Sequence, residues 1–275
     1  MERRPLYDLH LHTTCSDGTL SPTELTRLAK AQGLKAFAVT DHDTLEGIPE
    51  AESVSESLDI HLVPGVEVSA NFGDTAVHVL GLFVDYKEPW LERVFVGARR
   101  RRVERIHLIV SKLAKEGVEI EPEAVFARSR HGSVGRPHVA EVLVEKGVVK
   151  TIAEAFERFL SDDRPAYVGY DTVTLEDACD LIRRAKGVAS LAHPVHYGND
   201  ALIPEMASTG LQAIEVYHKD HSQTKVEKYA KLDADLGLLA TGGSDFHRPD
   251  STGSAALGCR EITEERFEAL RTAAG

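Results

Sequence analysis

Residues 7–19, YDLHLHTTCSDGT, place an aspartate and two histidines at alternate positions, with a second aspartate five residues further on. Successive side chains of a β-strand point to opposite faces, so Asp8, His10 and His12 share one face and the leucines between them share the other. A solvent-facing strand edge would explain one such histidine, but it explains two histidines and Asp17 in so short a stretch poorly. The stretch therefore indicates a chemical site built on an early strand.

The composition is that of an ordinary globular chain with a surplus of histidine. The 275 residues are 42% hydrophobic, which allows one large domain or a large domain with an insert. We expect a cytoplasmic protein, because no long apolar run resembles a membrane span or a signal peptide. The net charge of -12 argues against binding to long duplex nucleic acid, and no feature identifies a protein partner. Thirteen histidines are a first hint of metal chemistry.

The three cysteines do not suggest a structural role. Cys15, Cys179 and Cys259 are far apart and form no CxxC pair. This spacing argues against a disulfide framework and against a thiolate zinc site.

Apolar, β-branched runs recur along the chain with helix-like segments between them. They are LYDLHL at 6–11, KAFAVT at 35–40, IHLVPGVEV at 60–68, AVHVLGLFV at 76–84, GVASLAH at 187–193, LQAIEVY at 211–217 and LGLLATGG at 236–243. One intervening helix is predicted after Ser21 as N-cap, with Pro22 at N1, Glu24 at N3 and Gly33 at the C-terminus. The alternation predicts a parallel α/β core, and seven strands without a GxGxxG loop favour barrel-like closure over a dinucleotide-binding sheet.

The pattern changes between Pro89 and about Pro165, where helical periodicity is long and no convincing strand occurs. Residues 89–165 are therefore predicted to form a helical insert, and residues 1–88 and 166–275 a discontinuous α/β domain. Because the insert follows a strand, we expect it to act as a lid over the end of the barrel that carries the chemistry. A helical decoration remote from the site is the alternative.

A histidine or a carboxylate follows or interrupts most of the predicted strands. The candidates are His10, His12, Asp17, His42, Glu67, His78, His193, Asp245 and His247. Taken singly, His78 could be a core histidine and Glu67 a salt-bridge partner, but strand ends of such folds converge on one rim. Imidazole and carboxylate ligands suit Mn, Fe, Co or Zn. Nine side chains are too many for one ion, and three divalent ions would use them all if Glu67 bridges two.

The segments DLHLHTTCSDGT, TDHDT, GVEVS, HVLG, AHP and GGSDFH resemble, in order and spacing, the motifs of the polymerase and histidinol phosphatase (PHP) superfamily. The resemblance covers nearly the whole chain and implies a distorted (β/α)7 TIM-like barrel with a trinuclear metal site, with Mn favoured and Fe or Zn as alternatives. Carried over, the first ion would be held by His10, His12, Glu67 and Asp245, the second by Glu67, His78 and His193, and the third by Asp17, His42 and His247.

The same resemblance leaves some positions open. Many members of the family have histidine where this chain has Asp17, so the binding of the third ion is open. Asp8 is expected to orient a ligand histidine from behind. Asp43 would orient a ligand or the leaving group, or else cap the helix that follows.

The predicted insert resembles the branch of the family that removes the 3'-phosphate from 3',5'-bisphosphonucleotides, some members of which also trim short RNA from the 5' end. The motifs are ARRRRVERI at 98–106 and GSVGRPHVA at 132–140. Arg99 and Arg102 share a helix face, and with Arg136 they are expected to grip a second phosphate, with His138 nearby. The alternative for the arginine run is a solvated helix face.

Together with this resemblance, the residues predict a metal-dependent phosphoesterase, and the resemblance implies that it hydrolyses the 3'-phosphate of small nucleotides through a hydroxide held by the ions. The candidate catalytic residues are His193, His247 and Asp17, and either histidine could protonate the leaving oxygen. The alternatives are a 5'-3' exoribonuclease acting on short 5'-phosphorylated oligonucleotides, a histidinol-phosphatase-like enzyme, and a noncatalytic module of the kind attached to some polymerases.

Overall fold

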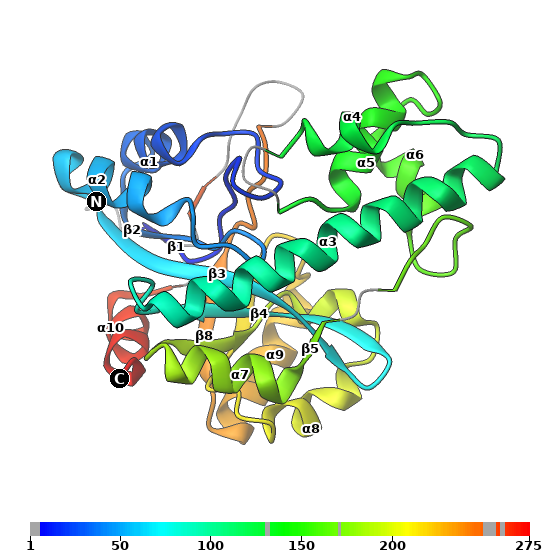
Figure 1. The fold of residues 1–275 in the computed structure, drawn as a ribbon. Helices are drawn as coiled ribbons and strands as arrows, with labels where there is room; N and C mark the ends of the chain where they lie inside the picture. Colours follow the sequence, from blue (N-terminus) through cyan, green and yellow to red (C-terminus); the bar gives the residue numbers. More distant parts are fainter. Residues whose placement is uncertain (1–5, 130–132, 170–171, 250–256, 259–261) are drawn as a thin grey trace.

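The computed structural model describes residues 6–129, 133–169, 172–249, 257–258 and 262–275 (Figure 1). The strands are β1 (Leu6–Asp8), β2 (Leu34–Val39), β3 (His61–Phe72), β4 (Thr75–Leu82), β5 (Val173–Thr174), β6 (Val188–Leu191), β7 (Ala213–His218) and β8 (Leu239–Gly243). The helices are α1 (Pro22–Ala31), α2 (Ile48–Leu58), α3 (Pro89–Lys115), α4 (Pro122–Phe126), α5 (Arg136–Glu145), α6 (Ile152–Ala155), α7 (Leu175–Arg184), α8 (Ile203–Ala207), α9 (Gln223–Leu236) and α10 (Glu264–Ala273), with the π-helical turn η1 (Phe156–Leu160) and the 3-10 turns η2 (Pro194–Tyr197) and η3 (Asp200–Leu202).

One sheet forms a nearly closed barrel, which confirms the predicted fold. Its order is β1-β2-β3-β4-β6-β7-β8, and the short β5 pairs with β3. The chain directly after β1 pairs with the last strand, β8: the Leu9 N–H donates to the Gly242 carbonyl at 3.2 Å. Strands that are distant in the sequence, β1 and β8, therefore lie at the two sides of one seam.

The predicted parallel core has an exception at β4. This strand runs antiparallel both to β3 and to β6. The physical reason is the connection between β3 and β4, a tight turn at Gly73 and Asp74 with Gly73 in the left-handed region at φ +57°. A turn of two residues can join only antiparallel neighbours, because a parallel crossover needs a dozen or more residues.

Helix α1 begins where the capping signals predicted. The Glu24 N–H donates to Ser21 Oγ at 3.2 Å, and the Ser21 N–H donates to Glu24 Oε2 at 2.8 Å. This reciprocal pair satisfies two backbone donors that the helix itself cannot satisfy. The C-cap is Gln32, and Gly33 follows it at φ +78°, a conformation that glycine adopts without strain.

Helix α3 joins two hydrophobic cores. Figure 1 shows it running from the side of the barrel to the group formed by α4, α5 and α6. Near its start, Leu91 and Phe95 pack in the barrel core, whereas Ile106 and Ile109 pack in a second core together with residues of α5 and η1. Ala166, just past the predicted end of the insert, belongs to the second core. The domain boundaries at 88/89 and 165/166 stay a prediction. The first of them lies at the N-terminus of α3, a helix that packs in both cores.

Two of the three cysteines lie within the described part of the chain. Cys15 and Cys179 are buried free thiols, and Cys259 lies outside the described residues.

Within the described part of the chain, no helix combines the length and the apolar character needed to traverse a bilayer.

Candidate metal centre

Residues 7–19 lead from β1 to the end of the barrel. Strand β1 stops at Asp8, and the chain continues between β2 and β8, where the Thr40 N–H donates to the Leu11 carbonyl at 2.9 Å and Leu11 pairs with Phe246. Leu9 and Leu11 are buried in the hydrophobic cores. His10 and His12 are fully buried on the opposite side. The predicted alternation is therefore present, although most of it lies past the end of the strand.

Glu67 of β3 is the centre of the polar cluster. Its two carboxylate oxygens lie close to five imidazoles, at 3.3 Å from His10 Nε2, 3.2 Å from His12 Nε2, 3.0 Å from His42 Nδ1, 2.8 Å from His78 Nδ1 and 2.9 Å from His193 Nε2. These histidines come from four different segments, after β1, after β2, in β4 and after β6, that meet at one end of the barrel. One carboxylate cannot give all five nitrogens a well-aligned hydrogen bond.

Several atoms of this cluster are buried without a hydrogen-bond partner among the described residues. They are His10 Nε2, His12 Nε2, Asp17 Oδ1, His42 Nδ1, Glu67 Oε2 and His193 Nδ1. Buried polar atoms are normally paired, so a concentration of unpaired donors and acceptors at one point needs an explanation. A bound cation is the natural one, because most of the imidazole nitrogens and carboxylate oxygens concerned converge there.

The other predicted ligands complete the cluster on two sides. Asp245 Oδ1 lies 3.5 Å from His10 Nε2 and 3.3 Å from His12 Nε2. Asp17 lies on the other side, with Oδ1 at 3.3 Å from His247 Nε2 and Oδ2 at 3.7 Å from His42 Nε2. The structure thus brings all nine predicted metal-binding side chains together.

Among the described residues, four groups of candidate ligand atoms each fit within 4.8 Å. Three consist of predicted ligands: His12, Asp17, His42 and His247; His10, His12 and Glu67; and His42, Glu67 and His78. The fourth is His196, His218 and Asp220. His42 lies next to two of the ligand sets that the family resemblance implies. Its Nδ1 faces Glu67, which belongs to the set of the second ion, and its Nε2 faces Asp17, which belongs to the set of the third. The number of ions stays a prediction.

The electrostatics of the cluster favour added positive charge. Burial opposes ionisation of His10, yet Glu215, Glu67 and Asp245 raise its pKa well above the usual value. Burial likewise opposes ionisation of His12, but hydrogen bonds to Asp245 and Glu67 raise its pKa to about 10. Conversely, burial alone would raise the pKa of the Glu67 carboxyl, and the surrounding imidazoles lower it well below its usual value. Divalent cations can replace these protons, so the donor set fits N,O-coordinated ions.

Asp8 and Asp43 do not hold a ligand imidazole. Asp8 accepts backbone N–H groups of Ser244 at 2.9 Å, Gly258 at 2.7 Å and His10 at 3.4 Å, so it fixes main chain, including that of the candidate ligand His10, and not a histidine ring. Asp43 accepts the Ser69 N–H at 2.8 Å and pairs with an arginine of α3. The capping alternative for Asp43 was wrong, because the N-cap of α2 is Gly47.

Two residues of β7 that the sequence analysis did not single out contact the cluster. Glu215 accepts from His10 Nδ1 at 3.1 Å, and His218 Nε2 lies 3.5 Å from Asp245 Oδ2. Both are buried. The signal for Glu215 was present in LQAIEVY, since a carboxylate inside an apolar strand is rarely buried without a partner.

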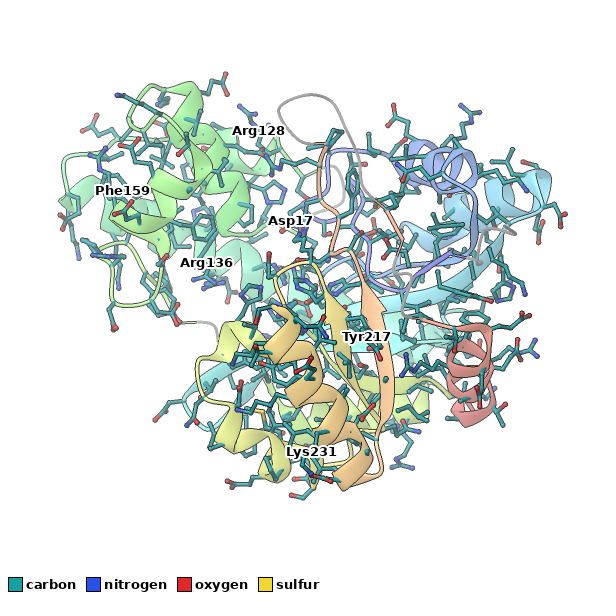
Figure 2. All side chains as sticks on the ribbon, turned by 180° about the vertical axis from the view of Figure 1, so that it is seen from behind. Asp17, Arg128, Arg136, Phe159, Tyr217 and Lys231 are labelled. Atoms are coloured by element: carbon teal, nitrogen blue, oxygen red, sulfur yellow. The ribbon has the colours of Figure 1, made fainter. Side chains whose placement is uncertain are left out.

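A cavity of about 230 Å³ lies against the cluster. Its wall includes Asp17, Glu67, His78, His193, Asp245 and His247 from the barrel and Arg102, Arg105, Arg136, Phe156 and Tyr167 from the neighbourhood of the insert. A second hollow of about 480 Å³ shares His78, His193, Arg136 and Phe156 with it. Figure 2 shows Asp17 on the barrel side and Arg136 on the insert side of this space. Insert residues therefore form part of the wall that faces the candidate ligands.

The four side chains expected to hold substrate differ in position. Arg136 lies on the cavity wall, where it donates to the Leu160 carbonyl at 3.2 Å and pairs with the exposed Asp162 at 3.3 Å. Arg102 also reaches the wall, but its guanidinium binds Asp43 at 2.7 Å, Ser69 Oγ at 2.8 Å and the Val134 carbonyl at 3.2 Å.

The structure does not bring Arg99 or His138 to the cavity wall. Arg99 pairs with Glu92 at 2.7 Å and with Glu46 at 3.0 Å, so carboxylates outside the cavity neutralise its charge. His138 is buried, and its Nδ1 accepts the Gly135 N–H at 3.0 Å. The Arg99–Glu46 pair ties α3 to the segment before α2, whereas the His138–Gly135 hydrogen bond is local to the insert.

Comparison with known proteins assigns the family. The model of the PHP domain matches residues 8–163. The 3',5'-nucleoside bisphosphate phosphatase of Chromobacterium violaceum is 36% identical over 253 residues, covering 90% of this chain and 88% of that protein. The 5'-3' exoribonuclease Rnm of Escherichia coli is 35% identical over 251 residues, covering 89% of this chain and 86% of that protein.

A solved structure from Bifidobacterium adolescentis, described as a metal-dependent phosphoesterase, superimposes with a TM-score of 0.88 at 29% identity and covers 99% of this chain and 98% of that one. The relatives thus agree on the chemistry of phosphate esters while their names differ in substrate. The chain belongs to the PHP domain family and is a metal-dependent phosphoesterase.

Proposed function

We propose that the protein hydrolyses the 3'-phosphate of small nucleotides such as 3',5'-bisphosphonucleotides. The observation that carries this proposal is the composition of the cavity wall, which has candidate metal ligands on one side and Arg105 and Arg136 on the other. A substrate with two phosphates can present one to each side. The name of the Chromobacterium relative supports the same substrate class.

The barrel side would bind the reacting phosphate. In this proposal three divalent ions, with Mn as the first choice, would be held by the ligand sets that the family resemblance implies. Bound there, they would neutralise charge on the phosphoryl oxygens and make water a better nucleophile. His193 and His247 both line the cavity, so both are candidates to donate a proton to the leaving 3'-oxygen.

The insert side would bind the second phosphate. Arg136 pairs with Asp162, whose side chain is 72% exposed, and exchanging such an exposed carboxylate for a phosphate costs little. Its guanidinium lies 5.7 Å from the ring centre of Phe156 and 5.6 Å from that of Tyr167, so apolar surface for a base or a ribose adjoins it. This arrangement favours Arg136 over Arg99 and Arg102 as the phosphate-binding arginine.

The substitution Arg136→Ala tests the proposal. In Mn-loaded protein, kcat/KM for a 3',5'-bisphosphonucleotide should fall about 10- to 100-fold, the effect of losing a charge-assisted hydrogen bond, while kcat/KM for a nucleoside 3'-monophosphate changes little. Arg158→Ala is the matched control, because Arg158 also belongs to the insert but pairs with Glu154 away from the cavity wall. Equal losses on both substrates would remove the second-phosphate role of Arg136.

The second candidate is 5'-3' exoribonuclease activity on short 5'-phosphorylated oligonucleotides. The observation in its favour is the larger hollow, which continues from His193 to His196 and Tyr197 and offers room for further nucleotides. Under this alternative the protein releases mononucleotides successively from a 5'-phosphorylated oligomer. Release of phosphate from bisphosphates with no cleavage of oligomers would reject it.

A further inference from the structure

Strand β7 contributes none of the nine candidate ligands, yet its glutamate contacts two of them. Glu215 is fully buried, with Oε1 at 3.1 Å from His10 Nδ1 and Oε2 at 2.7 Å from the backbone nitrogen of His193. We propose that Glu215 is a positioning residue that holds one ligand of each of two neighbouring ions. The proposal rests on the assigned ligands His10 and His193 and is independent of which phosphate ester is the substrate.

The first contact orients the ring of His10. A carboxylate can only accept hydrogen bonds, so His10 must carry a proton on Nδ1 to bind Glu215 Oε1. A neutral imidazole with its proton on Nδ1 has a bare lone pair on Nε2. That nitrogen lies 3.3 Å from Glu67 Oε2 and 3.5 Å from Asp245 Oδ1, among the other candidate ligands. Glu215 therefore selects the tautomer that can bind a metal ion.

The second contact holds strained backbone. His193 lies at φ +26° and ψ +60°, in a region that residues with a side chain rarely adopt. Such a conformation persists only where its surroundings determine it strongly. The short hydrogen bond from its N–H to the buried Oε2 is a charge-assisted constraint of this kind. It keeps His193 Nε2 at 2.9 Å from Glu67 Oε1.

A bulge in β7 explains how the strand reaches the cluster twice. Glu215 pairs with Thr241 and Tyr217 with Gly242, so one strand has an extra residue between these pairs. Without the bulge, residues 215 and 218 would point to opposite faces of the sheet. With it, Glu215 and His218 are both buried against the candidate ligands.

The isosteric substitution Glu215→Gln tests the proposal. The amide keeps one acceptor oxygen, and the His193 N–H must take it because a backbone N–H cannot accept. The amide NH2 then faces His10 Nδ1, which must become the acceptor, and the proton moves to Nε2, the nitrogen that would bind the ion. We expect the affinity for Mn²⁺, measured by calorimetry on metal-free protein, to fall about 10- to 100-fold, while the metal-free protein still unfolds cooperatively.

The matched control is Thr241→Val. Thr241 pairs with Glu215 across the strands and is equally buried, but its hydroxyl bonds Ser190 at 2.7 Å and contacts no candidate ligand. This variant should lose thermal stability and keep the wild-type affinity for Mn²⁺. Wild-type affinity in Glu215→Gln, or an equal loss of affinity in both variants, would overturn the proposal.

A second measurement decides the case if Glu215→Gln does not fold. In zinc-loaded wild-type protein labelled with ¹⁵N at histidine, the ring of His10 must carry its proton on Nδ1, with a downfield shift from the hydrogen bond to Glu215. A proton on Nε2 would overturn the proposal. Neither experiment uses a phosphate ester, so a wrong assignment of substrate would leave both results unaffected.

Discussion

The end of the barrel and the arginine run of α3 are both rich in charged or ionisable side chains. They differ in how many of these side chains have hydrogen-bond or ion-pair partners among the described residues. At the barrel end, five imidazoles crowd one carboxylate and several buried atoms lack a partner among the described residues. Along α3, Arg99, Arg100 and Arg102 each pair with a carboxylate. Arg101 Nε is buried without a hydrogen-bond partner among the described residues, so the run is not fully paired either. Three of its four arginines already have a carboxylate partner, whereas the barrel end gathers six unpaired atoms in one cluster.

This difference separates binding residues from structural ones. A buried polar group that lacks a partner costs free energy, and it persists where something else binds there. A paired arginine must first give up its partner before it can bind a phosphate, and for a buried pair that exchange is expensive. Arg136, with its exposed partner, is the arginine for which the exchange is cheap.

The substitution Glu67→Gln should have the largest effect, because Glu67 is the carboxylate that contacts five candidate ligands. Losing its negative charge should cost several kcal/mol of transition-state stabilisation, which corresponds to about a thousand-fold in phosphate release by the Mn-loaded enzyme. Bound metal, measured by atomic spectroscopy after gel filtration, should fall in parallel.

Glu52→Gln is the control for this substitution. Glu52 pairs with Lys87 and accepts a hydrogen bond from Tyr86 at 2.6 Å, away from the cluster, so metal content and activity should stay at the wild-type level. Full metal content in Glu67→Gln would show that the crowded carboxylate is a structural ion-pair centre, and the contrast between the two regions would fail.

The substitution Arg102→Ala should have an intermediate effect, on stability. It leaves Asp43 buried and charged without its partner, which typically costs about 3–5 kcal/mol in the free energy of unfolding. Arg100→Ala on the same helix should have little effect, because Arg100 is 81% exposed and its pair with Glu104 is solvated. Denaturant titration of the metal-free variants measures both. If both cost the same, Arg102 does not act as a buried anchor of the insert.

The smallest expected effect is a pH dependence at His138, where the insert meets the barrel. Burial lowers the pKa of His138 from 6.5, so the folded state favours the neutral ring that accepts the Gly135 N–H. The contribution of His138 is fully present above pH 6.5 and is lost as the pH falls from there through the lowered pKa of the folded state.

His138→Asn keeps an acceptor but does not titrate, so it isolates this contribution. Unfolding free energies of the two proteins between pH 8 and pH 5 should diverge, with the wild type losing more on the acid side. Parallel curves would show that His138 is not held in its neutral form by the fold.

Much of the barrel could be predicted from local pattern. The seven strands and helix α1 with its capping box follow from periodicity and from side chains that act within a few residues. The reversal of β4 was also available, because predicted strands at 60–68 and 76–84 leave too few residues for a helical crossover. The gathering of the nine candidate ligands was predictable because strand ends in such a fold meet at one rim.

The sequence by itself determined which seven strands form the barrel, which side chains stand at their ends and which family the motifs resemble; the short β5 was not predicted. Only the tertiary structure decided that Arg102 binds Asp43 and that Arg99 binds Glu46 and Glu92. It also decided that Glu215 reaches His10 across 205 positions of the chain. The reason is physical: periodicity and capping act over a few residues, whereas the partner of a buried charge depends on which distant segments pack around it.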